Sequence, residues 1–345
     1  MALTFASNAI FSKARAMYGK RLKESDYVKL LSCDTVPEIL TCLKGTEKYA
    51  PLLSKVNDKN IHRAQLEDIL RKQLFQEYEA LCRYEKTVGE DFAKYTIMKT
   101  EIVQIMNFLT LLNGGYQRQF SNAMPKYFNR VSSINFLGMA NADTYDEFLS
   151  VLGKSVYSKI LLPFKPEKGE KINLSNVENA LYTHLFKTVY TIIKKTSGEE
   201  RSDLKKLFDI DIDMRNFTRI LRLKEYYQME PEEIKKQLLP FGSFKKNQIK
   251  TLCEAYNKKE LFTIISQTSA GRIISKLDYE NVCEIPRKAL YKESYKRMYF
   301  SVNPSVVLVA YHALAETEIE NIIHIIEGVR YKVSTDKIKN TLIYN

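Results

Sequence analysis

The sequence predicts an all-α fold of three pseudo-repeated helical domains, which could stack as an open rod or close into a funnel with pseudo-threefold symmetry. Three observations lead to this prediction. Only 12 Gly and 9 Pro occur in 345 residues, and strands and tight turns rely on these residues. Apolar side chains recur at helical spacing along most of the chain. Two motifs recur at spacings of about 110 residues, which is typical of a repeat architecture.

The first repeated motif begins at a helix start and ends just after a turn. DTVPEILTCLKGTEKYAPLL (34–53) aligns with DTYDEFLSVLGKSVYSKIL (143–161) with one gap, through Asp-Thr, Glu, two leucines, a Gly turn and a Tyr. A weaker third copy is KELFTIISQTSAGRII (259–274). The three copies are marked by Glu38, Glu147 and Glu260.

The second repeated motif places an acid three residues before an amide, followed by apolar residues. Its copies pair Glu101 with Gln104, Asp213 with Asn216, and Glu318 with Asn321. Residues i and i+3 share one face of a helix. A buried carboxylate is costly unless it is paired and hydrogen-bonded. We therefore predict that these six residues are structural polar clasps, with each acid buried near a basic side chain or a helix-end amide.

The segments between the motifs have helical patterns of their own. Apolar residues fall on one helix face between Leu66 and Leu81 and between Val177 and Ile192, whereas the third copy is less regular, with Pro286 near its start. Helix-start signals occur at Ser25, Pro231 and Ser334. These patterns predict helical repeats over 1–120, 121–230 and 231–345. Because each repeat alone has a thin core, stacking or ring closure is expected to bury the remaining faces.

The net charge of +12 is spread evenly, with surpluses of +4, +3 and +5 in the three predicted repeats. An even surplus fits a surface that faces acidic partners or anionic lipid better than a nucleic-acid-binding arm. Two alternatives remain at this stage: a basic helical scaffold and a helical nucleic-acid-binding protein, which the many Tyr residues would suit.

Membrane and export signals are weak. No charge-free stretch exceeds 18 residues (102–117 has 16 and 298–315 has 18), whereas a spanning helix needs about 20. The acid-free, basic start MALTFASNAIFSKARAMYGKR resembles a transit peptide, but its apolar spacing continues into the next helical pattern. The five cysteines include no CxxC pair, which predicts free thiols in a reducing compartment.

No residue pattern predicts catalysis, a cofactor or a metal. Gly153-Lys154-Ser155 resembles the end of a phosphate-binding loop, but the first glycine of that motif would be Phe148, and the repeat places Gly153 in a turn equivalent to Gly45. The histidines have no metal-ligand spacing, and a satisfied or surface role is expected for His324. A proton relay through the repeated acids is the less favoured alternative to the clasp.

Three segments resemble the C subunits of the A-type/V-type rotary ATPases, known as d subunits in eukaryotic enzymes. They are SKARAMYGKRL (12–22), NFTRILRLKEYYQMEPEEIKKQLLPFGSF (216–244) and ENIIHIIEGVRYKVSTDKIKNTLI (320–343). The three acid–amide helices match as well. The sequence departs from the family pattern at Lys13, where Arg is expected, at Gln104, which replaces Asn, and at Gly114-Gly115.

The resemblance implies a non-catalytic, cytoplasmic funnel that lies on the membrane rotor ring and is peripheral to the membrane. It also implies that the central opening receives the D and F proteins of the central stalk, so that torque passes between the stalk and an H⁺- or Na⁺-translocating ring. No nucleic-acid partner and no functional homo-oligomer are expected. The choice between H⁺ and Na⁺ and the direction of ATP chemistry are properties of the other proteins in the enzyme.

Overall fold

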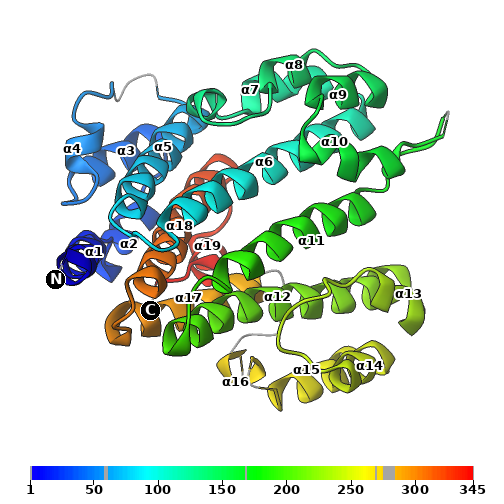
Figure 1. The fold of residues 1–345 in the computed structure, drawn as a ribbon. Helices are drawn as coiled ribbons and strands as arrows, with labels where there is room; N and C mark the ends of the chain where they lie inside the picture. The colour runs from blue at the N-terminus through cyan, green and yellow to red at the C-terminus, as the bar shows by residue number, and fades with distance from the viewer. Residues whose placement is uncertain (1, 58–60, 168, 269, 275–283, 345) are drawn as a thin grey trace.

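The computed structural model describes residues 2–57, 61–167, 169–268, 270–274 and 284–344. Across these ranges the chain is helical, with α helices, short 3-10 helices and no β-strand (Figure 1). The predicted helical class is therefore correct. Cys283 and part of the weak third copy of the first motif lie outside the described residues.

Three long helices and the helices that precede them form the frame of the molecule. The long helices are α6 (Gly89–Gly114), α12 (Gly198–Tyr227) and α18 (Pro304–Arg330). The helix before each one packs against it after a short connection, and these are α5 (Arg63–Cys82), α11 (Leu174–Ile193) and α17 (Ile285–Phe300). Pro286 lies in the first turn of α17, where its missing N–H costs no helical hydrogen bond.

The shorter helices gather in three groups at three corners of the molecule in Figure 1. The first group contains α2 (Glu24–Leu31), α3 (Val36–Lys44) and α4 (Ala50–Leu53). The second contains η1 (Gln117–Gln119), α7 (Phe120–Ala123), η2 (Lys126–Arg130), α8 (Phe136–Ala140), α9 (Tyr145–Leu152), α10 (Val156–Leu161) and η3 (Leu162–Phe164). The third contains α13 (Pro231–Lys236), α14 (Lys246–Glu254), α15 (Lys258–Ser266) and α16 (Gly271–Ile274).

The chain ends lie at the same end of the view in Figure 1. Helix α1 (Ala2–Gly19) packs along α18, and α19 (Thr335–Thr341) packs against α18 and α2. After α19, the ring of Tyr344 stacks on the ring of Tyr27 in α2, with 4.4 Å between their centroids. The last residues of the chain therefore contact the first group of short helices.

The first repeated motif forms the N-terminal cap of a helix in each copy. In each copy, a side chain at the helix start accepts a hydrogen bond from the backbone N–H of the marker glutamate, in the pairs Thr35 with Glu38, Thr144 with Glu147, and Asn257 with Glu260. The glutamate carboxylate in turn accepts a hydrogen bond from the backbone N–H of the residue just before that side chain. Such reciprocal bonds satisfy N–H groups that a helix start leaves free. The motif is thus a repeated helix start for α3, α9 and α15.

The long helices begin near one another and end apart. Near their starts, the Lys195 Nζ atom lies 2.7 Å from an Asp91 carboxylate oxygen, and the Ser305 hydroxyl bonds to the Glu200 carboxylate. At their other ends, Figure 1 shows α6 and α12 leading to different corners. Polar contacts between the helix starts therefore hold the frame together at the end where the long helices begin.

Each long helix ends in a turn with a left-handed residue, namely Gly115 (φ 74°), Gln228 (φ 47°) and Lys332 (φ 52°). In each turn a following backbone N–H bonds back to a carbonyl inside the helix, from Tyr116 to Leu111, Met229 to Leu223 and Val333 to Gly328. The first and third are C-terminal caps of the Schellman type, whereas the bond from Met229 to Leu223 spans one more residue. A tyrosine adjoins each left-handed residue, and the exposed fractions of Tyr116, Tyr227 and Tyr331 are 60%, 71% and 70%.

The buried apolar residues form three clusters that do not coincide with the predicted repeats. One cluster runs from Ile102 to Leu185, a second runs from Ile210 to Ala289, and a third joins residues from both ends of the chain. The third cluster contains Tyr27 and Leu30 of the first group together with Ile322 and Ile326 of α18. Burial therefore links the last helices to the first ones.

Candidate functional site

The three acids of the second motif are all buried, and each accepts a backbone N–H from a loop. Their exposed fractions are 3% for Glu101, 0% for Asp213 and 6% for Glu318. The donors are Ser133 N to Glu101 at 3.2 Å, Ser243 N to Asp213 at 2.9 Å, and Leu22 N to Glu318 at 2.8 Å. The three donor residues recur at spacings of about 110, like the motifs themselves. These three donor residues could not be identified from the sequence, because a backbone N–H leaves no residue type to recognise.

Hydroxyl groups supply the next donors. The Tyr157 hydroxyl donates to Glu101 and the Tyr49 hydroxyl donates to Glu318, each at 2.7 Å. These tyrosines occupy the aligned Tyr position of the first motif. The third copy has Ala270 at that position, and the Ser243 hydroxyl donates to Asp213 instead. The two repeated motifs therefore meet directly in space.

Only one of the three acids forms an ion pair among the described residues. The Lys48 ammonium lies 2.6 Å from the Glu318 carboxylate, and the two side chains are 13% and 7% exposed. For each acid the sequence predicts a basic side chain or a helix-end amide as partner, and at Glu101 and Asp213 no basic side chain forms an ion pair within the described part of the chain. Hydroxyl and backbone N–H donors replace it, because they satisfy a carboxylate without requiring a second charge to be buried.

The environment of Asp213 affects its protonation. Burial raises the pKa of the Asp213 carboxyl to about 6, although hydrogen bonds from Ser243 and Phe244 oppose the rise. Burial and the neighbouring carboxylates also raise the pKa of Tyr49 and of Tyr157. Both phenols therefore stay protonated and remain donors at neutral pH.

Each acid reaches the next group of short helices along the chain. Glu101 on α6 contacts the second group, and Asp213 on α12 contacts the loop before α14 in the third group. Glu318 on α18 contacts Lys48 and Tyr49 in the first group. The third contact thus runs from the last long helix back to the first group of short helices.

Two of the three predicted amide side chains form hydrogen bonds with both the backbone N–H and the backbone carbonyl of a single residue. The Asn216 side chain donates to Leu239 O at 3.0 Å and accepts from Leu239 N at 2.9 Å. Asn321 makes the same two contacts with Ile343, at 2.7 and 3.0 Å. An amide side chain can make this pair because it carries a donor and an acceptor side by side.

Gln104 differs from the other two amides. It is 7% exposed, but its Oε1 atom has no hydrogen-bond partner among the described residues. In this copy the paired contact is made instead by Asn113, further along α6, whose amide bonds Ile172 O and Ile172 N at 2.9 Å each. The longer side chain of Gln104 reaches no loop backbone, whereas Asn113 lies nearer the end of the helix.

A second polar cluster joins α6 to α18. The Lys99 ammonium lies 2.6 Å from the Glu316 carboxylate, and His312 Nδ1 lies 4.0 Å from the same carboxylate. Burial alone would raise the pKa of Glu316, but Lys99 lowers it to about 2. Burial lowers the pKa of His312 to about 4, so this histidine is neutral at pH 7.

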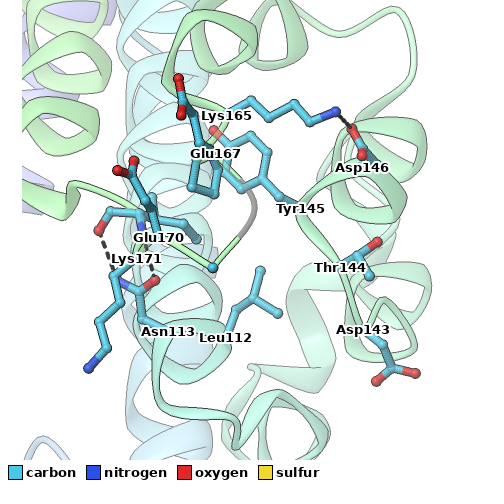
Figure 2. Close-up of a pocket in the computed structure, with 13 residues that line it drawn as sticks. Leu112, Asn113, Asp143, Thr144, Tyr145, Asp146, Lys165, Glu167, Glu170 and Lys171 are labelled. Atoms are coloured by element: carbon cyan, nitrogen blue, oxygen red, sulfur yellow. Dashed lines mark hydrogen bonds and ion pairs between the residues drawn. The ribbon is translucent and has the colours of Figure 1, made fainter.

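An open cleft of ≈ 950 Å³ lies between the end of α6, the start of α9 and residues 165–167 and 169–172 (Figure 2). Lys165 points to Asp146 across it, with 2.8 Å between Nζ and Oδ1, and the paired contact between Asn113 and Ile172 forms part of its wall. None of the six predicted clasp residues lines the cleft. The acids of the second motif therefore act inside the protein and not at this surface opening.

Gly153-Lys154-Ser155 and His324, which resemble parts of binding sites in the sequence, have structural surroundings in the fold. Gly153 ends α9 with φ 56°, so Gly153-Lys154-Ser155 is a turn between α9 and α10. His324 Nδ1 lies 3.4 Å from the Arg287 guanidinium, which also donates to Thr341 O. Across the described ranges, no group of three or more His, Cys, Asp or Glu side chains is placed to hold a metal ion.

Comparison with known proteins matches the chain from residue 10 to residue 341 to the model of the ATP synthase (C/AC39) subunit family. The chain belongs to this family. Curated relatives include the C subunit of the A-type ATP synthase of Pyrococcus furiosus, 20% identical over 339 residues, covering 95% of this chain and 88% of that protein.

Two other relatives, also C subunits of A-type ATP synthases, are from Thermococcus kodakarensis and Methanosarcina mazei. Each is 24% identical and covers 67% of this chain, with 60% and 62% of the relatives' own lengths aligned. As a member of the C/AC39 family, the chain is a subunit of a rotary ATPase. Among the described residues, none of its helices combines the length and apolarity needed to span a bilayer.

Proposed function

We propose that this protein is the non-catalytic central-rotor adaptor of an A-type/V-type rotary ATPase. In this role it receives the D and F proteins of the central stalk, rests on the membrane rotor ring at the cytoplasmic face, and passes torque between them. ATP chemistry in the head is thereby coupled to proton or sodium movement through the ring. The family membership and the shared name of the curated relatives support this assignment.

We also propose that the chain closes as a funnel of three similar domains, with approximate limits at 1–120, 121–230 and 231–345. The observation that carries this proposal is the set of three acid contacts. Each long helix holds the next group of short helices, and the last one holds the first through Glu318, Lys48 and Tyr49. A closed, densely packed ring deforms little under load, which suits a part that transmits torque.

The three divergent helix ends suit contact with a partner made of identical copies. Tyr116, Tyr227 and Tyr331 stand exposed at equivalent turns, whereas large aromatic side chains are more often buried. A repeated set of contacts matches a ring of repeated units better than a single asymmetric stalk. We therefore assign these ends to the rotor-ring side of the adaptor.

Binding measurements with purified partners test the proposed function. The purified chain is mixed with a D–F stalk pair and, separately, with a detergent-solubilised rotor ring from an A-type enzyme. Co-migration with both in size-exclusion chromatography, with no ATP turnover by the chain alone, is the expected result. Binding to neither partner, or ATP turnover by the pure chain, would exclude the adaptor role.

A further inference from the structure

Two cysteines at the first corner of the molecule lie in direct contact. The Sγ atoms of Cys33 and Cys42 are 3.4 Å apart, while two bonded sulfurs lie about 2.05 Å apart. Cys33 follows the end of α2, and Cys42 lies in the last turns of α3. The short connection between these helices is fixed by the Thr35 helix cap and by the hydrogen bond from Asp34 N to Glu38. A bond between the two sulfurs requires them to approach by about 1.4 Å.

The two thiols differ in their access to solvent. Cys33 is 8% exposed and its thiol also bonds Lys29 O at 3.4 Å, whereas Cys42 is half-buried. Burial raises the pKa of Cys33 to about 12, and contact with Cys42 contributes to the rise. Cys33 therefore stays protonated, and an oxidant from solvent meets Cys42 first.

We propose that Cys33 and Cys42 form a reversible thiol–disulfide site that reacts with low-molecular-weight disulfides such as oxidised glutathione. The Cys42 thiolate attacks the small disulfide, forms a mixed disulfide and releases one small thiol. The Cys33 sulfur, after losing its proton, attacks Cys42 Sγ and releases the second small thiol. Two cysteines are oxidised, and one small disulfide is reduced to two thiols.

The other described cysteines do not offer this chemistry. Cys82 and Cys253 are 2% and 0% exposed, and in the described ranges the only contact between two thiols is that of Cys33 with Cys42. The pair also adjoins the contact between the ends of the chain, because α3 leads to Lys48 and Tyr49, which hold Glu318. An oxidised pair would fix α3 to the end of α2 beside that contact.

Mass spectrometry after oxidation tests the site. The full-length chain is treated with oxidised glutathione, free thiols are alkylated, and the protein is cut with trypsin. Trypsin leaves both cysteines in one peptide, Leu30–Lys44, since no Lys or Arg lies between them. The expected peptide carries no alkyl group, and its mass is lower by two hydrogen atoms than that of the same peptide with two free thiols. Cleavage after Glu38 then yields halves that separate only after reduction.

Two variants act as controls for this experiment. Cys42→Ser should abolish the mass loss, whereas Cys253→Ser, which changes a buried thiol away from the pair, should retain it. Three results would overturn the proposal: alkylation of both cysteines after oxidation, a stable glutathione adduct on Cys42 with Cys33 free, or mass loss that persists in Cys42→Ser. Recovery of both free thiols with dithiothreitol is the expected sign of reversibility.

Discussion

Glu318 joins the last long helix to residues near the start of the chain. Its carboxylate accepts from a backbone N–H, a phenol and an ammonium group, and all of these donors come from the first fifty residues. A buried carboxylate with this set of donors is stable in place, but its removal leaves three donors without an acceptor. Loss of the Glu318 side chain is therefore expected to destabilise the fold more than loss of a surface glutamate.

Replacing Glu318 by alanine is expected to lower the free energy of unfolding by about 3 kcal/mol, because it leaves the buried Lys48 charge unpaired. Glu320→Ala is the matched control, since Glu320 lies on the same helix and pairs with Arg71 at 30% exposure. The control should cost under about 1 kcal/mol. Urea unfolding measures both changes. Equal losses in the two variants would contradict the role assigned to Glu318.

Asp213 gives a prediction about pH. Its folded pKa of about 6 lies above its ordinary value of 3.8, so the folded state binds the proton more tightly than the unfolded state. The stabilising contribution of this proton is present below pH 4 and is lost as the pH rises through 6. Asp213→Asn removes this dependence and retains an acceptor for the Ser243 N–H.

The free energy of unfolding of the wild type, measured relative to Asp213→Asn, should therefore fall by about 2 kcal/mol between pH 4 and pH 7. Urea titrations of both proteins at a series of pH values provide the difference. Parallel pH profiles for the two proteins would show that Asp213 titrates as an ordinary carboxyl.

At the scale of elements, the sequence predicted the repeated parts better than their contacts. The helix-start glutamates and the acid motif were visible as residue types at fixed spacing, and so were the long helices that carry the acids. The loop N–H donors at Leu22, Ser133 and Ser243 were not, because backbone groups carry no sequence signal. Asn113 was also missed, since it stands outside the repeated spacing and meets a residue far along the chain.

The amide side chains on the long helices differ in their contacts, so replacing them is expected to cost different amounts of stability. Asn216→Leu should cost about 2 kcal/mol, because Leu239 N and Leu239 O lose their partners inside the protein. Gln104→Leu should change the free energy of unfolding by less than about 1 kcal/mol, since Gln104 Oε1 has no partner to lose among the described residues. Thermal and urea unfolding compare the two variants. A larger cost at Gln104 than at Asn216 would refute this account of the amides.

At the scale of the whole molecule, Figure 1 shows short helices at three corners around a frame of long helices. The helical class was predictable from composition and periodicity. The boundaries between buried clusters were not, because the core at residues 102–185 crosses the predicted limit at 120 and the third cluster joins both ends of the chain. Packing between distant segments determines these boundaries, and the local pattern of apolar residues contains no information about it.

The exposed tyrosines allow a test of the rotor-ring side. The triple variant Tyr116→Ser, Tyr227→Ser and Tyr331→Ser should bind a rotor ring at least about tenfold more weakly, which corresponds to about 1.4 kcal/mol. Tyr256→Ser is the control, because Tyr256 is 92% exposed but lies between α14 and α15. If the wild type binds the ring and the triple variant binds it with the same affinity, the ring contact lies at another surface. The adaptor role itself would not be contradicted by that result.

The central claim is that this protein couples rotation of the stalk to the membrane ring. Its most direct measurement is ATP-driven ion uptake by vesicles that contain an A-type enzyme assembled with and without this chain, with ATP hydrolysis followed in parallel. The account predicts that without the chain the head still hydrolyses ATP but drives no ion uptake, and that adding the chain restores uptake. Equal ion uptake in both preparations would contradict it.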